Sequence, residues 1–419
     1  MANKDEIEAL KPQASTLKAA YEEFRAKGLA LDMTRGKPCK EQLDLSLDLL
    51  TNLARDEFKD KSGTDTRNYG GIDGLPEAKT LMGTLLDVPA EQVLVGDNSS
   101  LTLMYLTVAQ AMSHGVAGGS GPWSQQKPKF LCPSPGYDRH FSICEHFGIE
   151  MIVVDMNDDG PDMDAVEKLV AQDDSIKGIW LVPKYSNPAG TTLSDAVALR
   201  LASMPTKARD FRLMWDNAYA VHHLGSGPAK LANVLELCER AGNPDRPFIF
   251  GSTSKVTFAG AGLAAMGGSA LNMDWMRKHR SMMTIGPDKV NQLRHVRLLP
   301  DRQGLFEHMN KHAAILAPKF AKVQEVLGKR LGSTGLARWT NPSGGYFVSL
   351  DTLDGCAKRV VALANAVGVK LTAAGATFPL GKDPKDRNIR IAPSLPSLTE
   401  IEQAMEVLCC CVKLASLEK

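Results

Sequence analysis

The sequence predicts an α/β protein whose larger part is built on a mainly parallel β-sheet and whose smaller part is α+β. Seven short runs rich in valine, isoleucine and leucine follow one another from residue 93, and helical segments separate most of them. Continuous apolar strands that alternate with helices are typical of a parallel sheet buried on both faces. The runs are 93–96, 129–133, 149–156, 178–185, 211–219, 247–254 and 263–270.

The segments between these runs carry helical periodicity. The clearest are 99–113, 137–147, 194–204 and 228–240. The last two apolar runs are joined too tightly for a crossover helix. We therefore expect them to pair antiparallel or to leave the regular pattern.

The two ends of the chain follow a different rhythm. A helix is predicted over 3–27, ending near Gly28, before an extended segment at 31–38. Helical patterning dominates 272–331. Beyond it, we expect strands at 344–350, 369–374 and 388–392 and helices at 354–367 and 397–416. The expected division is 1–50, shared with the small domain, 51–300, the large domain, and 301–419, the small C-terminal domain.

Composition excludes several classes of function. Hydrophobic residues make up 43% and charged residues 23% of the 419 residues, and the net charge is +1. These values are typical of a soluble globular protein with no electrostatic attraction to nucleic acid or an acidic membrane. The charged N-terminus carries no signal region, and no run of about 18 apolar residues predicts a membrane helix. Eight cysteines without a C-x-x-C pair fit reduced thiols in the cytoplasm, and no metal site is predicted.

Lys255 stands at the mouth of a predicted strand, in the motif Ser252-x-x-Lys255. It is either a solvated loop residue or a reactive amine. A free lysine is protonated at ordinary pH, but desolvation lowers its pKa and lets it form a Schiff base with an aldehyde. The motif alone leaves both interpretations open.

Other polar residues follow predicted strands, where open parallel sheets bind their ligands. A carboxylate such as Asp216, at the end of an apolar run, is costly to bury unless it is paired. It is either a helix cap or structural ion pair, or the partner of a heterocyclic nitrogen. Asn187 is a turn residue or a hydrogen-bond donor to a ligand. The run Asn98, Ser99 and Ser100 either caps a helix or binds phosphate at its N-terminus.

Three further residues could belong to the same site. Tyr219, three residues after Asp216, could reach the same ligand. Tyr137 could stack on a planar ring or simply pack. Arg390 is a cation between two apolar neighbours, and a carboxylate bound by both guanidinium edges would satisfy it.

Together these residues resemble, in chain order, the site of class I/II aminotransferases of pyridoxal-phosphate (PLP) fold type I. The matching residues are Tyr69, Asn98, Ser99, Ser100, Tyr137, Asn187, Asp216, Tyr219, Ser252, Lys255 and Arg390. The chain looks most like the bacterial subgroup Ic aspartate aminotransferases, through the segments 34–38, 42–46, 68–74, 252–262 and 284–289. The resemblance implies a large PLP-binding domain with a mostly parallel seven-stranded sheet between helices. It also implies that 1–50 contributes an active-site lid.

The resemblance assigns the residues around the cofactor ring. Lys255 would hold PLP as a Schiff base and, once freed, would move a proton between the substrate α-carbon and the cofactor. Asp216 would keep the ring nitrogen protonated, which makes the ring an electron sink. Tyr219 and Asn187 would hydrogen-bond the phenolic oxygen, and Tyr137 would stack on the ring.

The resemblance also assigns the phosphate and substrate ligands. Ser99, Ser100, Ser252 and Asn98 would hold the phosphate. Tyr69 would reach the phosphate of the partner subunit, which implies a homodimer with shared active sites. Arg390 would bind the substrate α-carboxylate, with Gly36 lying over the substrate. The implied reaction is ping-pong transfer from L-aspartate to 2-oxoglutarate, giving oxaloacetate and L-glutamate.

Two departures from the family pattern stand out. Leu263 occupies the position, eight residues after the lysine, where relatives place an arginine that anchors the phosphate. Ser254 or Thr257 could contribute instead. The arginine that binds the distal substrate carboxylate is also not evident. Our candidates for it, in order, are Arg139, then Lys37 and Arg35, then the partner's Lys289.

Several alternatives remain open. Within the enzyme class, the amino donor could be kynurenine, α-aminoadipate or an aromatic amino acid, or the enzyme could be a β-lyase. A regulator with an aminotransferase-like domain would need a DNA-binding module before residue 30. Ser252-x-x-Lys255 also matches serine acyl-enzymes, but their companion motifs are absent from the sequence. The glycines at 260 and 262 imitate a dinucleotide fingerprint without a clear strand-turn-helix unit.

Overall fold

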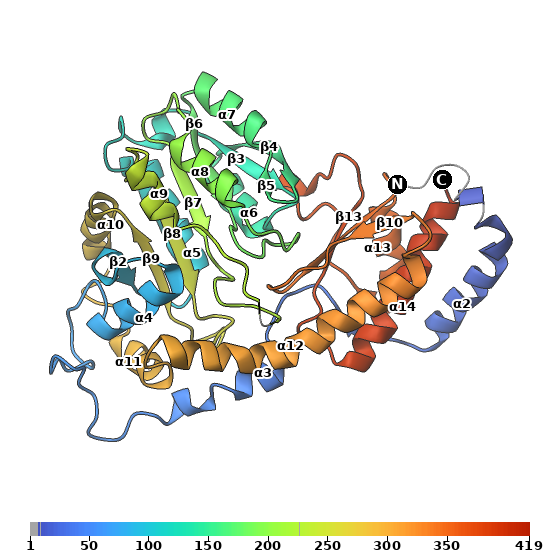
Figure 1. Cartoon of the computed structure of the whole chain (residues 1–419), viewed down its shortest axis with the longest axis horizontal. Coiled ribbons are helices and arrows are strands. Elements are labelled where there is room, and N and C mark those ends of the chain that lie inside the picture. Colours follow the sequence, from blue (N-terminus) through green and yellow to red (C-terminus); the bar gives the residue numbers. More distant parts are fainter. Residues whose placement is uncertain (1–6, 9, 226) are drawn as a thin grey trace.

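The structure is a computed structural model that describes residues 7–8, 10–225 and 227–419. A large α/β part and a smaller α+β part lie side by side along the long axis (Figure 1). The predicted N-terminal helix is observed as a 3₁₀ turn followed by α2, while its expected start at 3–6 lies outside the described residues. The bounds are η1 Lys11–Gln13 and α2 Ala14–Ala26.

The large part is built on one sheet with the strand order β2-β9-β8-β7-β6-β3-β4-β5. The seven expected strands are all present, and β5 is an additional two-residue strand that turns back on β4. β9 runs antiparallel to β8, which confirms the prediction from the short connection. The bounds are β2 Val93–Val95, β3 Lys129–Ser134, β4 Glu150–Asn157, β5 Gly160–Pro161, β6 Ile176–Leu181, β7 Arg212–Asp216, β8 Pro247–Ser252 and β9 Ala264–Gly268.

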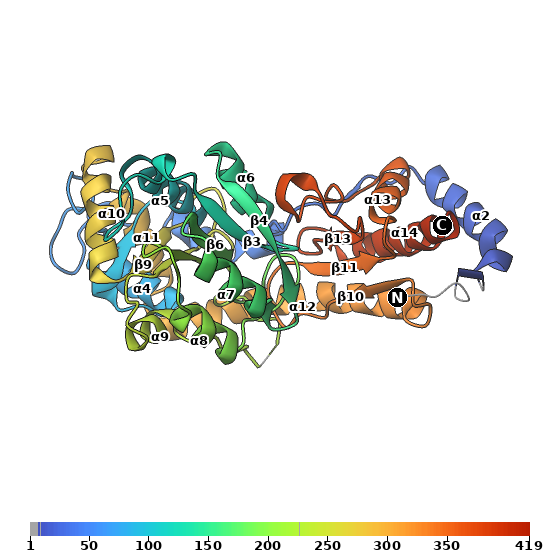
Figure 2. The same cartoon turned by 90° about the horizontal axis from the view of Figure 1, so that it is seen from above.

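Helices cover both faces of this sheet, so every residue of β6 and β7 is buried. Figure 2 shows α5 and α6 on one side and α7, α8 and α9 on the other. α9 begins at Val234 and not at 228, because Asn233 caps it by accepting a hydrogen bond from the Glu236 backbone. The bounds are α4 Pro76–Leu86, α5 Ser100–His114, α6 Asp138–His146, α7 Met163–Gln172, α8 Asp195–Ser203, α9 Val234–Arg240, α10 Ala270–Met283 and α11 Lys289–Leu298.

The small part has a three-stranded antiparallel sheet, β10-β11-β13, and a short parallel pair, β1 and β12. N-terminal residues join its core, since α2 packs against α14. The helices are α12 Arg302–Leu331, α13 Ala357–Ala366 and α14 Leu398–Leu417. The strands are β1 Leu31–Asp32, β10 Ala337–Trp339, β11 Val348–Thr352, β12 Val369–Lys370 and β13 Asn388–Ile391.

The long helix α12 connects the two parts along their lower side (Figure 1). Its first turns contribute Leu305 and Met309 to the large core, and its last turns contribute Val323 and Leu327 to the small one. The expected division at 300/301 therefore falls at the start of a helix that packs on both cores. The remaining short helices are α3 Lys40–Asp44, η2 Leu47–Leu50, η3 Ala90–Gln92, η4 Trp123–Gln125 and η5 Pro379–Gly381. None of the helices in the described ranges has the length and apolarity needed to cross a bilayer.

Candidate active site

A cavity of about 580 Å³ opens between the carboxyl edge of the large sheet, the N-termini of α5 and α6, and β13 of the small part. Most of the sequence-predicted site residues line it. They are Gly36, Lys37, Ser99, Ser100, Tyr137, Arg139, Asn187, Asp216, Tyr219, Ser252, Lys255 and Arg390. Residues from seven separated segments thus meet where a parallel sheet is expected to bind its ligand.

Lys255 follows β8 and lines the cavity. Its Nζ lies 5.1 Å from the centre of the Tyr219 ring and 5.8 Å from that of Tyr346. Burial lowers the pKa of the amine from its ordinary value, and the negative charge of Asp216 opposes this shift only in part. The lysine is therefore an amine that loses its proton more readily than a solvated one.

Asp216 is the last residue of β7 and is 1% exposed. Its Oδ2 lies 2.9 Å from Nε2 of His140, whose ring stacks on Trp180 with 4.4 Å between centroids. Its Oδ1 is buried without a hydrogen-bond partner among the described residues. Because an unpaired buried carboxylate oxygen is costly, it marks a position where a ligand donor would be stabilised.

The sequence analysis did not identify His140 as a site residue. It lies one helical turn after Tyr137 at the start of α6, and this i, i+3 spacing was the available signal. Its ring meets Tyr137 edge-on, with 4.9 Å between centroids. His140 thus links the predicted ring-stacking residue to the predicted carboxylate.

Arg390 on β13 is buried and faces the cavity. Its Nη1 donates to Oδ1 of Asp138 at 2.8 Å and to Oδ1 of Asn187 at 3.3 Å. The guanidinium carbon lies 4.9 Å from the centre of the Phe347 ring. Neither Asp138 nor Phe347 was predicted. Asp138 directly follows Tyr137, but only the fold brings it opposite Arg390.

Serine side chains also line the cavity, around the N-terminus of α5. Ser99 is the N-cap of α5 and accepts a hydrogen bond from the Leu101 backbone at 3.2 Å. Ser252 donates to Ser254 at 3.0 Å, and Ser254 donates to the carbonyl of Asn98 at 3.2 Å. Hydroxyls and free amides at a helix N-terminus suit an anion such as phosphate.

Two sequence-based suggestions for this anion site differ from what the structure shows. The Asn98 side chain turns away from the cavity, since its Nδ2 donates to the Gly260 carbonyl at 3.5 Å. Thr257 is wrong as a phosphate ligand, because it is fully buried against Thr253 and His295. Leu263 belongs to the hydrophobic core, which leaves Ser254 as the residue that lines the cavity.

Lys289, which we expect to act from the partner subunit, is held by backbone carbonyls of its own chain. Lys289 is buried, and its Nζ donates to the carbonyls of Asn68 at 2.8 Å and Gly70 at 2.7 Å. It therefore fixes the backbone on both sides of Tyr69. The Tyr69 side chain is 81% exposed and lies outside the cavity of its own chain.

The charge of the cavity favours anionic ligands. Its cations are Arg35, Lys37, Arg139, Lys255 and Arg390, whereas its carboxylates are Asp138 and Asp216. Within the described ranges, no three histidine, cysteine or acidic side chains gather as a metal site. The arrangement combines a buried amine, a carboxylate with one oxygen unpartnered among the described residues, and groups suited to anions on α5 and β13.

Comparisons with known proteins agree with this arrangement. Residues 6–419 match the family described as aspartate amino-transferase. An aspartate aminotransferase of Corynebacterium glutamicum is 50% identical over 96% of this chain and 93% of its own length. A crystal structure of an aspartate transaminase from the same species superposes with a TM-score of 0.96 at 48% identity, covering 100% and 98% of the two chains. For the fold alone, an α-aminoadipate aminotransferase of Thermus thermophilus, complexed with phosphopyridoxyl-leucine, is similar at 20% identity with a TM-score of 0.75, covering 97% and 98%.

Proposed function

The chain belongs to the aspartate aminotransferase family, and we propose that it transfers the amino group of L-aspartate to 2-oxoglutarate, with PLP held by Lys255. The observation that carries this proposal is that a buried lysine shares the cavity with Asp216, whose Oδ1 has no partner in the part of the chain that the structure describes. The aminotransferase activity follows from the family. The cofactor, the donor and the residue roles are our proposal.

The residues present fit PLP. The free Oδ1 of Asp216 would accept a hydrogen bond from the ring nitrogen, and the His140 contact holds the other oxygen in place. Tyr137 would stack on the ring, while Tyr219 and Asn187 would donate to its phenolic oxygen. When bound, PLP supplies an electron sink for the substrate α-carbon.

The phosphate would be held without an arginine. Ser99, Ser100, Ser252 and Ser254 offer hydroxyls, and the 15-residue helix α5 presents its N-terminal amides. The helix dipole favours an anion there. These uncharged hydroxyls and amides would take the place of the arginine that binds the phosphate in other relatives.

Lys255 would perform the proton transfer. Because burial lowers its pKa, the Nζ held beside Tyr219 would act as a base when the substrate amine has displaced it. It would take the proton from the substrate α-carbon and return one on the cofactor side. The reverse sequence with the 2-oxo acid would complete a ping-pong cycle.

Arg390 would bind the substrate α-carboxylate, and Arg139 the side-chain carboxylate, with Lys37 and Arg35 as the next candidates. Gly36 lies close over this region, since a Cβ built on it would stand 2.7 Å from Cζ of Phe347. A larger residue would displace the N-terminal segment from the cavity. This supports the role of 1–50 as the lid of the site.

A homodimer would complete the site. Tyr69 would reach the phosphate of the partner subunit from its exposed loop. Exposed apolar side chains lie near this loop, among them Met282 and Ile285. The segment that carries them packs on the loop, as a Cβ on Gly286 would stand 2.3 Å from the carbonyl of Gly70. A surface of this kind is typical of an interface, and a cytoplasmic dimer agrees with the composition.

A spectroscopic experiment tests the function. Protein purified with PLP is expected to be yellow, to change its absorption on addition of L-aspartate, and to recover with 2-oxoglutarate. A donor panel of aspartate, kynurenine, α-aminoadipate and tyrosine identifies the preferred substrate. If aspartate produces neither the change nor oxaloacetate while another donor does, the proposed donor is wrong.

A further inference from the structure

We propose that Asp138 is an internal competitor for the substrate, occupying Arg390 until an incoming α-carboxylate displaces it. This inference rests on the proposed role of Arg390 as the α-carboxylate site. It adds a residue that sets the affinity of the site for both the amino acid and the 2-oxo acid.

The ion pair spans the cavity from one part of the molecule to the other. Asp138 is the first residue of α6 in the large part, whereas Arg390 lies on β13 of the small part. Their atoms Oδ1 and Nη1 are 2.8 Å apart, and both residues line the cavity. A substrate carboxylate that enters the cavity therefore has to displace the carboxylate of Asp138 from Arg390.

The two partners differ in their exposure to water. The Arg390 side chain is 8% exposed and that of Asp138 is 36% exposed. Leaving a buried guanidinium unpaired costs free energy, so the contact with Asp138 stabilises Arg390 before a substrate binds. The more exposed carboxylate recovers hydration when it is displaced, which makes the exchange feasible.

The contact geometry favours displacement over a fixed structural pair. Asp138 contacts one guanidinium nitrogen, Nη1, and Nε has no partner among the described residues. A substrate carboxylate that bonds two nitrogens makes a stronger, charge-assisted pair. Asn187 and the Phe347 ring also contact the guanidinium, so Arg390 keeps its orientation when Asp138 leaves.

The competition has a consequence for turnover. Every amino acid and 2-oxo acid in the reaction carries the same α-carboxylate, so Asp138 weakens the binding of all of them alike. It also offers Arg390 a replacement partner as each product leaves. Removing its charge should tighten binding of both substrates together and should not change the preference between them.

The test is Asp138→Asn in the PLP-loaded enzyme. Calorimetry measures the dissociation constants of succinate and propionate, which carry a carboxylate but no amine to react. The variant is expected to bind both about tenfold more tightly, and the KM values of both substrates should fall in parallel while kcat does not rise. The tenfold figure corresponds to about 1.4 kcal/mol in binding free energy.

Asp195→Asn is the matched control. Asp195 is likewise the first residue of a helix, α8, and is exposed. It controls for the change in net charge and for the loss of a carboxylate in a first helical turn, and it should leave both dissociation constants unchanged.

Unchanged or weaker carboxylate binding in Asp138→Asn would overturn the inference, as would a parent enzyme that binds neither probe. Tighter binding in Asp195→Asn of equal size would overturn it as well, because a general charge effect would then suffice. The proposed donor is judged separately, since neither probe depends on aspartate being the substrate.

Discussion

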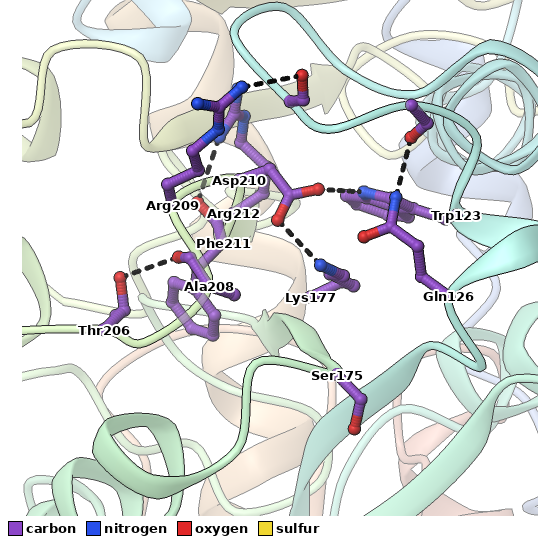
Figure 3. Close-up of polar contacts among 12 residues, drawn as sticks. Trp123, Gln126, Ser175, Lys177, Thr206, Ala208, Arg209, Asp210, Phe211 and Arg212 are labelled. Carbon is purple, nitrogen blue, oxygen red and sulfur yellow. Dashed lines mark hydrogen bonds and ion pairs between the residues drawn. The ribbon is translucent and has the colours of Figure 1, made fainter.

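Strand β7 has a buried aspartate near each end, and the two differ in their hydrogen bonding. Asp210, just before its amino end, and Asp216, at its carboxyl end, are each 1% exposed. Asp210 accepts from Nζ of Lys177 and from Nε1 of Trp123, both at 2.9 Å (Figure 3). Asp216 has one partner, His140, and its second oxygen has none among the described residues.

The difference distinguishes a carboxylate whose two oxygens are both satisfied within the protein from one that has an oxygen available to a ligand. A buried charge with all its partners contributes to a defined fold, whereas a half-satisfied one costs free energy. The same contrast holds for the buried lysines, since Lys177 is paired with Asp210 while Lys255 faces the cavity. In a parallel sheet, the carboxyl edge is where such a cost is compensated by binding.

The largest expected effect is that of Lys255→Ala. Loss of the amine should lower kcat by about 10⁴-fold, the upper range for an acid–base group, and PLP should then bind only non-covalently. Lys177→Met is the matched change at the other end of the sheet and should leave the kinetics of the folded enzyme unaltered. Retained transamination by Lys255→Ala would refute the mechanism.

Asp210→Asn should act on stability. It leaves Lys177 buried without a counter-charge, which costs about 3–5 kcal/mol in the free energy of unfolding. Urea unfolding of the cofactor-free protein measures this loss, and kcat below the transition should equal that of the parent. A variant as stable as the parent would show that Asp210 is not structural.

Asp216→Asn should show the opposite profile. The stability of the cofactor-free protein should change little, because Oδ1 has no partner to lose. Activity should fall by about 10²–10³-fold, as when a preorganised electrostatic group is removed. The same unfolding and kinetic measurements apply to both aspartates. Equal losses of stability and of activity in the two variants would show that Asp210 and Asp216 do not differ in role.

Arg139→Ala should have a smaller effect, confined to specificity. Arg139 lines the cavity but is exposed, so its removal should lower kcat/KM for aspartate by roughly tenfold, near the lower end for a hydrogen bond to a charged group. The value for tyrosine as donor should stay the same. Equal losses for aspartate and tyrosine would show that Arg139 does not select the donor.

The sequence predicted what is local to strand ends. The ends of apolar runs singled out Lys255, Asp216 and Asn187, and the family resemblance assigned their roles. His140 and Asp138 were missed because a helix, α6, turns them towards residues that are distant in the chain. Asp210 and Lys177 are 33 residues apart, and no local sequence pattern predicts an ion pair between them.

Contacts within the chain also hold two side chains that the sequence analysis named. Thr257 was a phosphate candidate because it is near Lys255 in sequence, and Lys289 was a candidate from the partner subunit. Thr257 turns to His295, and Lys289 turns to the carbonyls beside Tyr69. Side-chain direction after a strand depends on what packs there, which periodicity does not encode.

The smallest expected effect is a pH dependence that distinguishes Lys255 from a solvated lysine. Its pKa is lowered in the folded protein by burial, so the unfolded chain binds more protons between that lowered value and the ordinary 10.5. Stability of the cofactor-free protein should therefore rise with pH through this window. Lys255→Met removes the titrating group, so subtracting its unfolding free energy from that of the parent isolates the rise. A difference that stays flat or falls with pH would show that burial does not lower the pKa of Lys255.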